Sequence, residues 1–173
     1  MNILVTGAKG FIGKNLIAEL KNRHYKNIFE YDIDTDPVLF DYYCKEADFI
    51  FHLAGVNRPK EQSEYMEGNF GFTSNMLNVL KKHKNHCPVM ISSSIQAELD
   101  NPYGKSKKAG EDLVFSYGRE TGAKVLVYRF PNVFGKWCRP NYNSVIATFC
   151  YNISHDLPIK INDPNTVLKL VYI

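Results

Sequence analysis

Short, mostly apolar runs alternate along the chain with longer segments of helical periodicity. The apolar runs predict buried parallel strands at residues 2–6, 27–31, 48–55, 88–91 and 124–129, with shorter strands at 159–161 and 167–173. Apolar positions three or four residues apart predict helices after Gly13 and over 37–47, 62–83, 103–121 and 144–154. This alternation predicts an α/β protein, a doubly wound parallel sheet with helices on both faces.

Residues 7–13 form a G-x-x-G-x-x-G turn between the first strand and the first helix. Gly7 would allow the tight turn, Gly10 the approach of a pyrophosphate, and Gly13 the packing of the helix on the strand. The helix N-terminus would offer N–H groups and its positive dipole end to phosphates. The turn therefore predicts a Rossmann-type dinucleotide site. Its expected contacts are Gly7, Lys9, Gly10, Phe11, Ile12 and Gly13.

Asp32 ends the second strand, 19 residues past Gly13, where an acidic side chain can accept hydrogen bonds from the adenosine ribose. No lysine or arginine lies between Asp32 and Cys44 to hold a 2′-phosphate, which favours NAD over NADP. The predicted cofactor is NADH or NADPH, and this sequence feature favours NADH.

The third strand ends in small residues, so Leu53, Ala54 and Gly55 are expected against the cofactor. His52 precedes them and is interpreted as a packed core histidine, not a catalyst or ligand. Arg58, in the following loop, could face a ligand phosphate or solvent. Asn69, between glycines in the helix 62–83, could hold a kink and a water.

A Tyr-x-x-x-Lys pair, Tyr103 and Lys107, opens the helix 103–121 and shares one helix face. A free tyrosine has a pKa near ~10, and a neighbouring ammonium would lower it, which suits a general acid or base. Ser94 ends the fourth strand, where ligands bind in open α/β sheets, and is expected to face a reacting carbonyl. Ser92 and Ser93 are expected to cap strands and turns.

After the fifth strand, residues 131–135 are expected to form a turn and residues 136–144 a loop rich in Lys, Trp, Arg, Tyr and Asn. This mixture suits a nucleotide base and a diphosphate, and the alternative is a surface lid anchored by Trp137. Candidate substrate contacts are Arg58, Asn132, Lys136, Trp137, Arg139 and Asn143.

Composition narrows the class further. Hydrophobic residues make up 45% and charged residues 23% of 173 residues, which is typical of a soluble globular domain. The net charge is +3, and the basic cluster 81–84 is interpreted as a solvated helix end or a weak anion patch, so no nucleic-acid partner is predicted. The four cysteines lack metal or disulfide spacing, which favours reduced thiols in a cytoplasmic protein without a metal site. No apolar run approaches the roughly 18 residues of a membrane span.

Together these motifs resemble the extended short-chain dehydrogenase/reductase family. The residues that carry the resemblance are the glycine turn, His52-Leu53-Ala54-Gly55, Ser92-Ser93-Ser94, Tyr103-x-x-x-Lys107 and Arg129-Phe130-Pro131-Asn132-Val133-Phe134-Gly135. The resemblance covers the whole chain and implies Ser94, Tyr103 and Lys107 as the catalytic set, with Asn69 matching the family's helix asparagine. It also implies that Tyr103 and Lys107 contact the cofactor, and a homodimer is possible by analogy.

Residues 92–97, 101–104 and 134–150 are similar, more specifically, to the reductase domain of bifunctional capsular-polysaccharide enzymes, which a cupin domain follows. This implies reduction of the C4 ketone of a UDP-4-keto-6-deoxy-hexosamine (UDP-2-acetamido-2,6-dideoxy-hexulose) in UDP-N-acetyl-L-fucosamine biosynthesis. Residues 1–173 would then be the NAD(P)-binding domain of a truncated chain, with the substrate part incomplete and the cupin domain absent.

Two other functions remain open at this point, an NAD-dependent nucleotide-sugar C4 epimerase and a non-catalytic cofactor-sensing domain. Ile95-Gln96 replaces the Thr-Asp-Glu set of the family's 4,6-dehydratases, which argues against dehydration.

Overall fold

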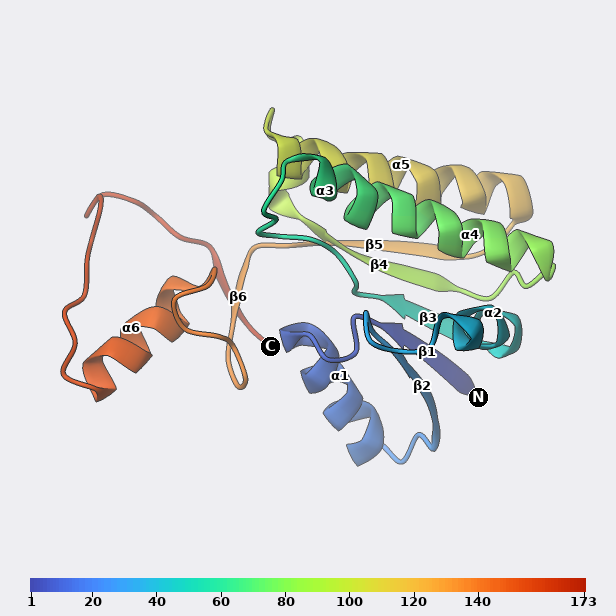
Figure 1. Cartoon of the computed structure of the whole chain (residues 1–173), viewed down its shortest axis with the longest axis horizontal. Helices are drawn as coiled ribbons and strands as arrows, with labels where there is room; N and C mark the ends of the chain where they lie inside the picture. Colours follow the sequence, from blue (N-terminus) through green and yellow to red (C-terminus); the bar gives the residue numbers. More distant parts are fainter. The chain divides into compact units, whose positions relative to one another are not determined.

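A five-stranded sheet with the strand order β2-β1-β3-β4-β5 forms the centre of the unit Met1–Arg129 (Figure 1). The strands are β1 (Asn2–Thr6), β2 (Asn27–Tyr31), β3 (Phe49–His52), β4 (Val89–Ser94) and β5 (Val125–Phe130). The pairs β1–β2, β1–β3 and β3–β4 are parallel. This computed structural model describes all residues from 1 to 173 and confirms the α/β fold that the sequence predicts.

Helices pack on both faces of the sheet because side chains alternate along each strand. Ile3 and Val5 of β1 share a core with α1 (Phe11–Asn22). Leu4, between them, packs in the opposite core with α2 (Pro37–Glu46), α4 (Phe72–Lys82) and α5 (Pro102–Thr121). The sheet therefore separates two apolar cores.

Local signals fix the ends of α5. The Asn101 side chain accepts a hydrogen bond from the Gly104 N–H at 2.7 Å, and Pro102 occupies the first turn, where its missing N–H has no cost. Gly122 ends the helix at φ +75°, a left-handed conformation that glycine adopts freely. These caps place Tyr103 in the first turn of the helix, as the sequence predicts.

The predicted single helix over 62–83 is interrupted. The segment consists of α3 (Ser63–Tyr65), the π-helical η1 (Met66–Gly71) and α4. The Thr73 hydroxyl donates to the Asn69 carbonyl at 2.6 Å, which satisfies a backbone oxygen where the helix widens. The widening lies at Asn69, the polar residue that suggested a kink.

The unit Phe130–Ile173 contains β6 (Asn132–Phe134), α6 (Val145–Ser154) and β7 (Leu170–Tyr172). The predicted turn at 131–135 is wrong, because β6 pairs in parallel with β7. The predicted strand at 159–161 is also wrong, since these exposed residues have no strand partner. The predicted strand 167–173 is shortened to β7.

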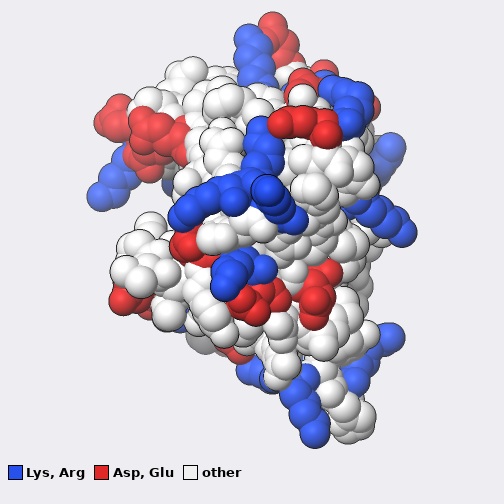
Figure 2. Space-filling view, turned by 90° about the vertical axis from the view of Figure 1, so that its right-hand side faces the viewer, with Lys and Arg blue, Asp and Glu red and all other residues white.

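Basic and acidic side chains are interspersed on the face that Figure 2 shows. At the end of α4, Lys81 pairs with Glu120 and Lys82 with Asp41. The cluster 81–84 is thus a solvated helix end in which Lys81 and Lys82 are paired with carboxylates. No helix combines the length and apolar character that crossing a membrane requires.

Candidate active site

The glycine turn connects β1 to α1 in a conformation that side chains would prevent. Gly7 has φ +70°, and a Cβ there would lie 2.7 Å from the Ala54 nitrogen. A Cβ on Gly13 would lie 2.2 Å from the Gly7 carbonyl oxygen. Both positions therefore require glycine for reasons of space, because the obstructing atoms belong to the backbone.

A cleft of about 590 Å³ opens beside this turn. Its lining includes seven of the predicted cofactor residues, Gly7, Lys9, Gly10, Asp32, Leu53, Ala54 and Gly55. The other predicted cofactor residues are not in this lining: Phe11, Ile12 and Gly13 begin helix α1, and Tyr103 and Lys107 lie on α5. The cleft follows the carboxyl ends of β1, β2 and β3, where parallel sheets bind nucleotides.

Asp32 holds the turn in place. One oxygen of its carboxylate accepts the Lys9 backbone N–H at 2.7 Å, and the other accepts the Ile33 N–H at 2.8 Å. The Lys9 ammonium pairs with Asp34, which raises the pKa of Lys9. Lys9 thus supplies a basic group near the acidic end of β2. The expectation that no lysine or arginine lies there considered only residues after Asp32, and Lys9 precedes Asp32 in the chain.

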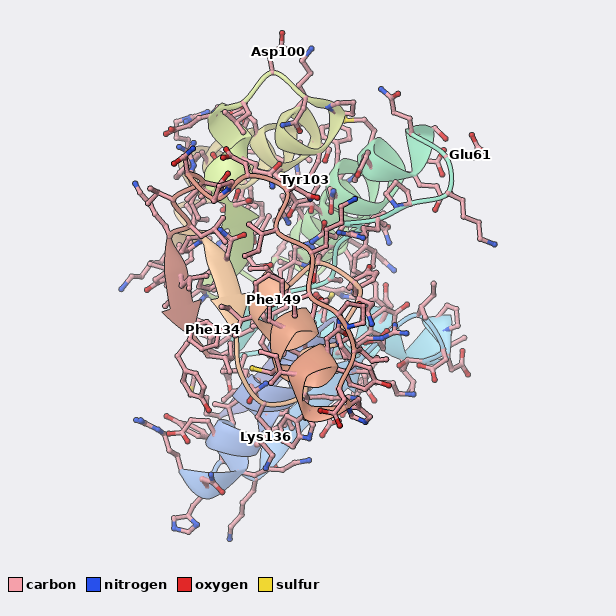
Figure 3. All side chains as sticks on the ribbon, turned by 90° about the vertical axis from the view of Figure 1, so that its left-hand side faces the viewer. Glu61, Asp100, Tyr103, Phe134, Lys136 and Phe149 are labelled. Atoms are coloured by element: carbon pink, nitrogen blue, oxygen red, sulfur yellow. The ribbon has the colours of Figure 1, made fainter.

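The Ser94 side chain lies close enough to the Tyr103 phenol to lower its pKa, so the structure brings together two of the three predicted catalytic groups. Figure 3 shows Tyr103 just after the loop that carries Asp100. Burial raises the pKa of Tyr103, the Ser94 side chain opposes this rise, and the nearby Tyr65 adds to it. The net direction is opposite to the lowering expected from a neighbouring lysine.

The Lys107 ammonium explains this difference. It donates to the Ser92 carbonyl at 2.8 Å, and a Cβ on Gly55 would lie 3.4 Å from it. Lys107 therefore lies beside Gly55 of the cleft lining and is bonded to β4. Burial lowers the pKa of Lys107 to about 8, opposed by the negative charge of Glu111.

Asn69 uses its side chain to fix the loop after β3. Its oxygen accepts the Val56 N–H at 2.9 Å, and its amide donates to the Val56 carbonyl at 3.0 Å and to Ser106 at 2.9 Å. All of these partners belong to the protein. These bonds let Asn69 hold the loop after β3 against α5, and its catalytic role stays a prediction.

His52 is a core histidine, as predicted, with 1% of its surface exposed. Since the Thr73 hydroxyl hydrogen is donated to Asn69, Thr73 must accept from His52 Nε2, at 2.9 Å. His52 Nδ1 then accepts from Thr6 at 2.8 Å. The neutral ring with hydrogen on Nε2 is therefore the form that satisfies both contacts, and burial lowers the pKa of His52 to about 3.

This histidine should make the fold sensitive to acid. The unfolded chain takes up the proton near pH 6.5 and the folded chain only near 3, so stability falls as pH drops between these values, by about 1.4 kcal/mol per pH unit. In His52→Gln, urea unfolding at pH 7 and pH 5 should show a shallower dependence. The exposed His86→Gln serves as the control, and an unchanged slope in the His52 variant would refute this assignment.

Sequence reasoning missed a buried carboxylate, Glu111, which accepts hydrogen bonds from Ser93 and Arg129. The prediction that Ser92 and Ser93 cap strands and turns is wrong. Instead both lie buried within β4, with the Ser92 hydroxyl 3.4 Å from the His52 carbonyl. The Glu111 spacing, four residues after Lys107 on α5, was the available signal, since the two share a helix face.

The candidate substrate contacts fall in two units. Arg58 lies exposed in the first unit, and Asn132, Lys136, Trp137, Arg139 and Asn143 lie in the second. Within the second unit the Lys136 ammonium lies 4.5 Å from the centre of the Trp137 ring, and Asn132 donates to the Lys169 carbonyl. Lys136 is labelled in Figure 3.

The parallel sheet, the glycine turn and the cleft at the carboxyl ends of the strands define a Rossmann-type nucleotide-binding protein. The model of the NAD dependent epimerase/dehydratase family matches residues 3–172, and the chain belongs to this family.

Two similar proteins indicate which members of this family the chain resembles. The chain is 44% identical over 173 residues to a UDP-2-acetamido-2,6-beta-L-arabino-hexul-4-ose reductase of Pseudomonas aeruginosa, covering 100% of this chain and 46% of the relative. It is 49% identical, with a TM-score of 0.89, to the capsular polysaccharide assembling protein CapF of Staphylococcus aureus, covering 99% of this chain and 47% of that one. The chain thus spans about half the length of these two relatives.

A UDP-glucose 4-epimerase of Thermotoga maritima matches with a TM-score of 0.87 at 22% identity, covering 99% of this chain and 69% of that one. This likeness shows the shared fold alone.

Proposed function

We propose that this chain forms the cofactor-binding and catalytic part of an NAD(P)H-dependent nucleotide-sugar reductase. The proposed reaction reduces the C4 ketone of a UDP-4-keto-6-deoxy-hexosamine, UDP-2-acetamido-2,6-dideoxy-hexulose, in capsular or O-antigen polysaccharide biosynthesis. The observation that carries the proposal is the placing of Ser94, at the carboxyl end of β4, beside Tyr103, in a chain related to a named hexulose reductase.

The residues fit a dinucleotide. Gly7 and Gly13 leave space that a Cβ would fill, and the cleft of about 590 Å³ is wide enough for the nucleotide portion. Gly10 and the N-terminus of α1 would face the pyrophosphate, with Asp32 at the adenosine ribose. Lys107, beside Gly55, would contact the nicotinamide ribose. Bound NAD(P)H would supply the hydride.

The protein groups would then manage the ketone oxygen. Tyr103 would donate its phenolic proton to this oxygen as hydride reaches the carbon, and Ser94 would donate a hydrogen bond to the same atom. The raised pKa of Tyr103 keeps the phenol protonated at neutral pH, which is the state that a proton donor needs. Lys107 would hold the cofactor without setting the Tyr103 pKa, because its ammonium is bonded to the Ser92 carbonyl.

Stoichiometry separates the reductase from an epimerase. The purified protein, supplied with NADH or NADPH and UDP-4-keto-sugars, should oxidise one cofactor for each hydroxyl formed. Conversion between C4 epimers without net cofactor consumption would support an epimerase instead. Cofactor binding without turnover of any UDP-sugar would support a sensing domain.

The choice between NADH and NADPH can be tested at Lys9. Its ammonium is the basic group paired beside the acidic end of β2, and it is exposed. Lys9→Ala should weaken NADPH binding about two- to five-fold, the size of one exposed ion pair, and leave NADH binding unchanged. Calorimetric titration of both cofactors measures this difference. Lys14→Ala, exposed on α1, is the matched control, and equal weakening of both cofactors would exclude a 2′-phosphate contact.

A further inference from the structure

A buried carboxylate, Glu111, and a partly exposed arginine, Arg129, form an ion pair. Glu111 is 1% exposed and lies on α5. Its carboxylate accepts hydrogen bonds from Arg129 Nε at 2.8 Å and Nη2 at 2.7 Å, which is a bidentate arrangement. The same carboxylate accepts the Ser93 hydroxyl at 2.5 Å.

Arg129 has a second carboxylate partner. Its Nη1 donates to Glu98 at 2.6 Å. Glu98 is the last residue of the 3₁₀ turn η2 (Ile95–Glu98), which begins directly after Ser94. One guanidinium thus joins α5 to the turn that follows β4.

These contacts bracket Ser94 from both sides along the chain. Ser93, immediately before it, is held by Glu111, and Glu98, four residues after it, is held by Arg129. The Ser94 hydroxyl also accepts the Gln96 N–H at 3.2 Å and so caps η2. The residues on each side of Ser94, Ser93 and Glu98, are therefore both hydrogen-bonded to the Glu111–Arg129 pair.

Glu111 lies on the same face of α5 as the proposed catalytic groups Tyr103 and Lys107. Glu111 follows Lys107 by four residues and Tyr103 by eight on α5, so all three project from neighbouring turns of one helix face. Because the Glu111 carboxylate on this face bonds to Ser93 of β4, it links the helix to the strand.

We propose that Arg129 and Glu111 are positioning residues that hold Ser94 in place beside Tyr103. The inference rests on the proposed reductase function for its kinetic test. Arginine is required because its planar fork satisfies Glu111 with two bonds and Glu98 with a third, which a lysine ammonium cannot reproduce.

A double-mutant cycle on kcat tests the proposal. R129K keeps the charge and should lower kcat about ten-fold, within the range of one misplaced general-acid partner, with little change in the Kd for NADH. In the S94A background, R129K should cost less than about two-fold, since the residue through which it acts is already gone. Multiplicative losses in the double variant would overturn the proposal.

Two further variants separate positioning from folding. E98Q removes only the exposed arm of the network and should lower kcat about two- to three-fold without loss of folded protein. R119K, an exposed arginine on the same helix, is the matched control and should leave kcat unchanged. Wild-type kcat in both R129K and E98Q would refute the proposal.

The crystal structure of R129K gives an answer that does not depend on turnover. It should show the Ser94 hydroxyl displaced away from Tyr103 relative to the wild-type structure, and an unchanged Ser94 position would overturn the proposal. If the wild-type protein reduced no UDP-4-keto-sugar, the proposed function would fail, while this structure would still decide the positioning role.

Discussion

Replacing Tyr103 by phenylalanine should lower turnover of the UDP-4-keto-sugar by about 10²–10⁴-fold, the usual contribution of a general acid. The substitution removes the phenolic hydroxyl that Ser94 contacts and leaves the ring in place. The Kd for NADH should stay within a factor of about two, since the glycine turn is untouched. Steady-state kinetics and cofactor titration measure the two effects separately.

A tyrosine on the same helix provides the control for this result. Tyr117 is buried on α5, and its hydroxyl donates to the Asn85 carbonyl at 2.9 Å, within the apolar core. Tyr117→Phe should cost about 1 kcal/mol of stability and leave kcat unchanged. Turnover retained in Tyr103→Phe would remove Tyr103 from its proposed role.

Gly13→Ala should destabilise the fold by about 3 kcal/mol and abolish cofactor binding. The added methyl would lie 2.2 Å from the Gly7 carbonyl oxygen and 2.9 Å from the Ala8 carbonyl oxygen. Neither atom can yield without moving β1 or α1, because both belong to the backbone. Urea unfolding and NADH titration measure the two losses.

Gly10→Ala is a matched comparison within the same turn. Its methyl would lie 3.1 Å from the Gly7 oxygen, a contact that small shifts can relieve. Stability should change by less than about 1 kcal/mol, while NADH binding weakens because Gly10 lines the cleft. A Gly13→Ala protein as stable as wild type would contradict the packing argument for this turn.

The parts of the molecule that sequence reasoning found are those that local rules determine. β1 to β4 contain short apolar runs that can be recognised without knowing how the chain folds. Asn101 and Pro102 mark the start of α5 in the sequence itself. The glycine turn is likewise recognisable from spacing. These features sufficed for the fold and for the cleft beside the turn.

The parts that it missed depend on partners distant in the chain. Asn132 becomes a strand residue because it pairs with Leu170, which no local pattern reveals. Lys9 reaches Asp34 across the turn. The direction of the Tyr103 pKa depends on burial, a property of the packed structure, and not on the Tyr-x-x-x-Lys spacing.

The π-helical segment Met66–Gly71 has a consequence for how this protein can change. Deleting one residue there would restore a regular helix and rotate everything upstream by roughly 100°, the angle between successive residues of an α-helix. Asn69 would then turn away from Val56, whose backbone it clamps at the edge of the cleft. A single deleted codon at this point would therefore present a different rim to the ligand while the sheet beneath stayed the same.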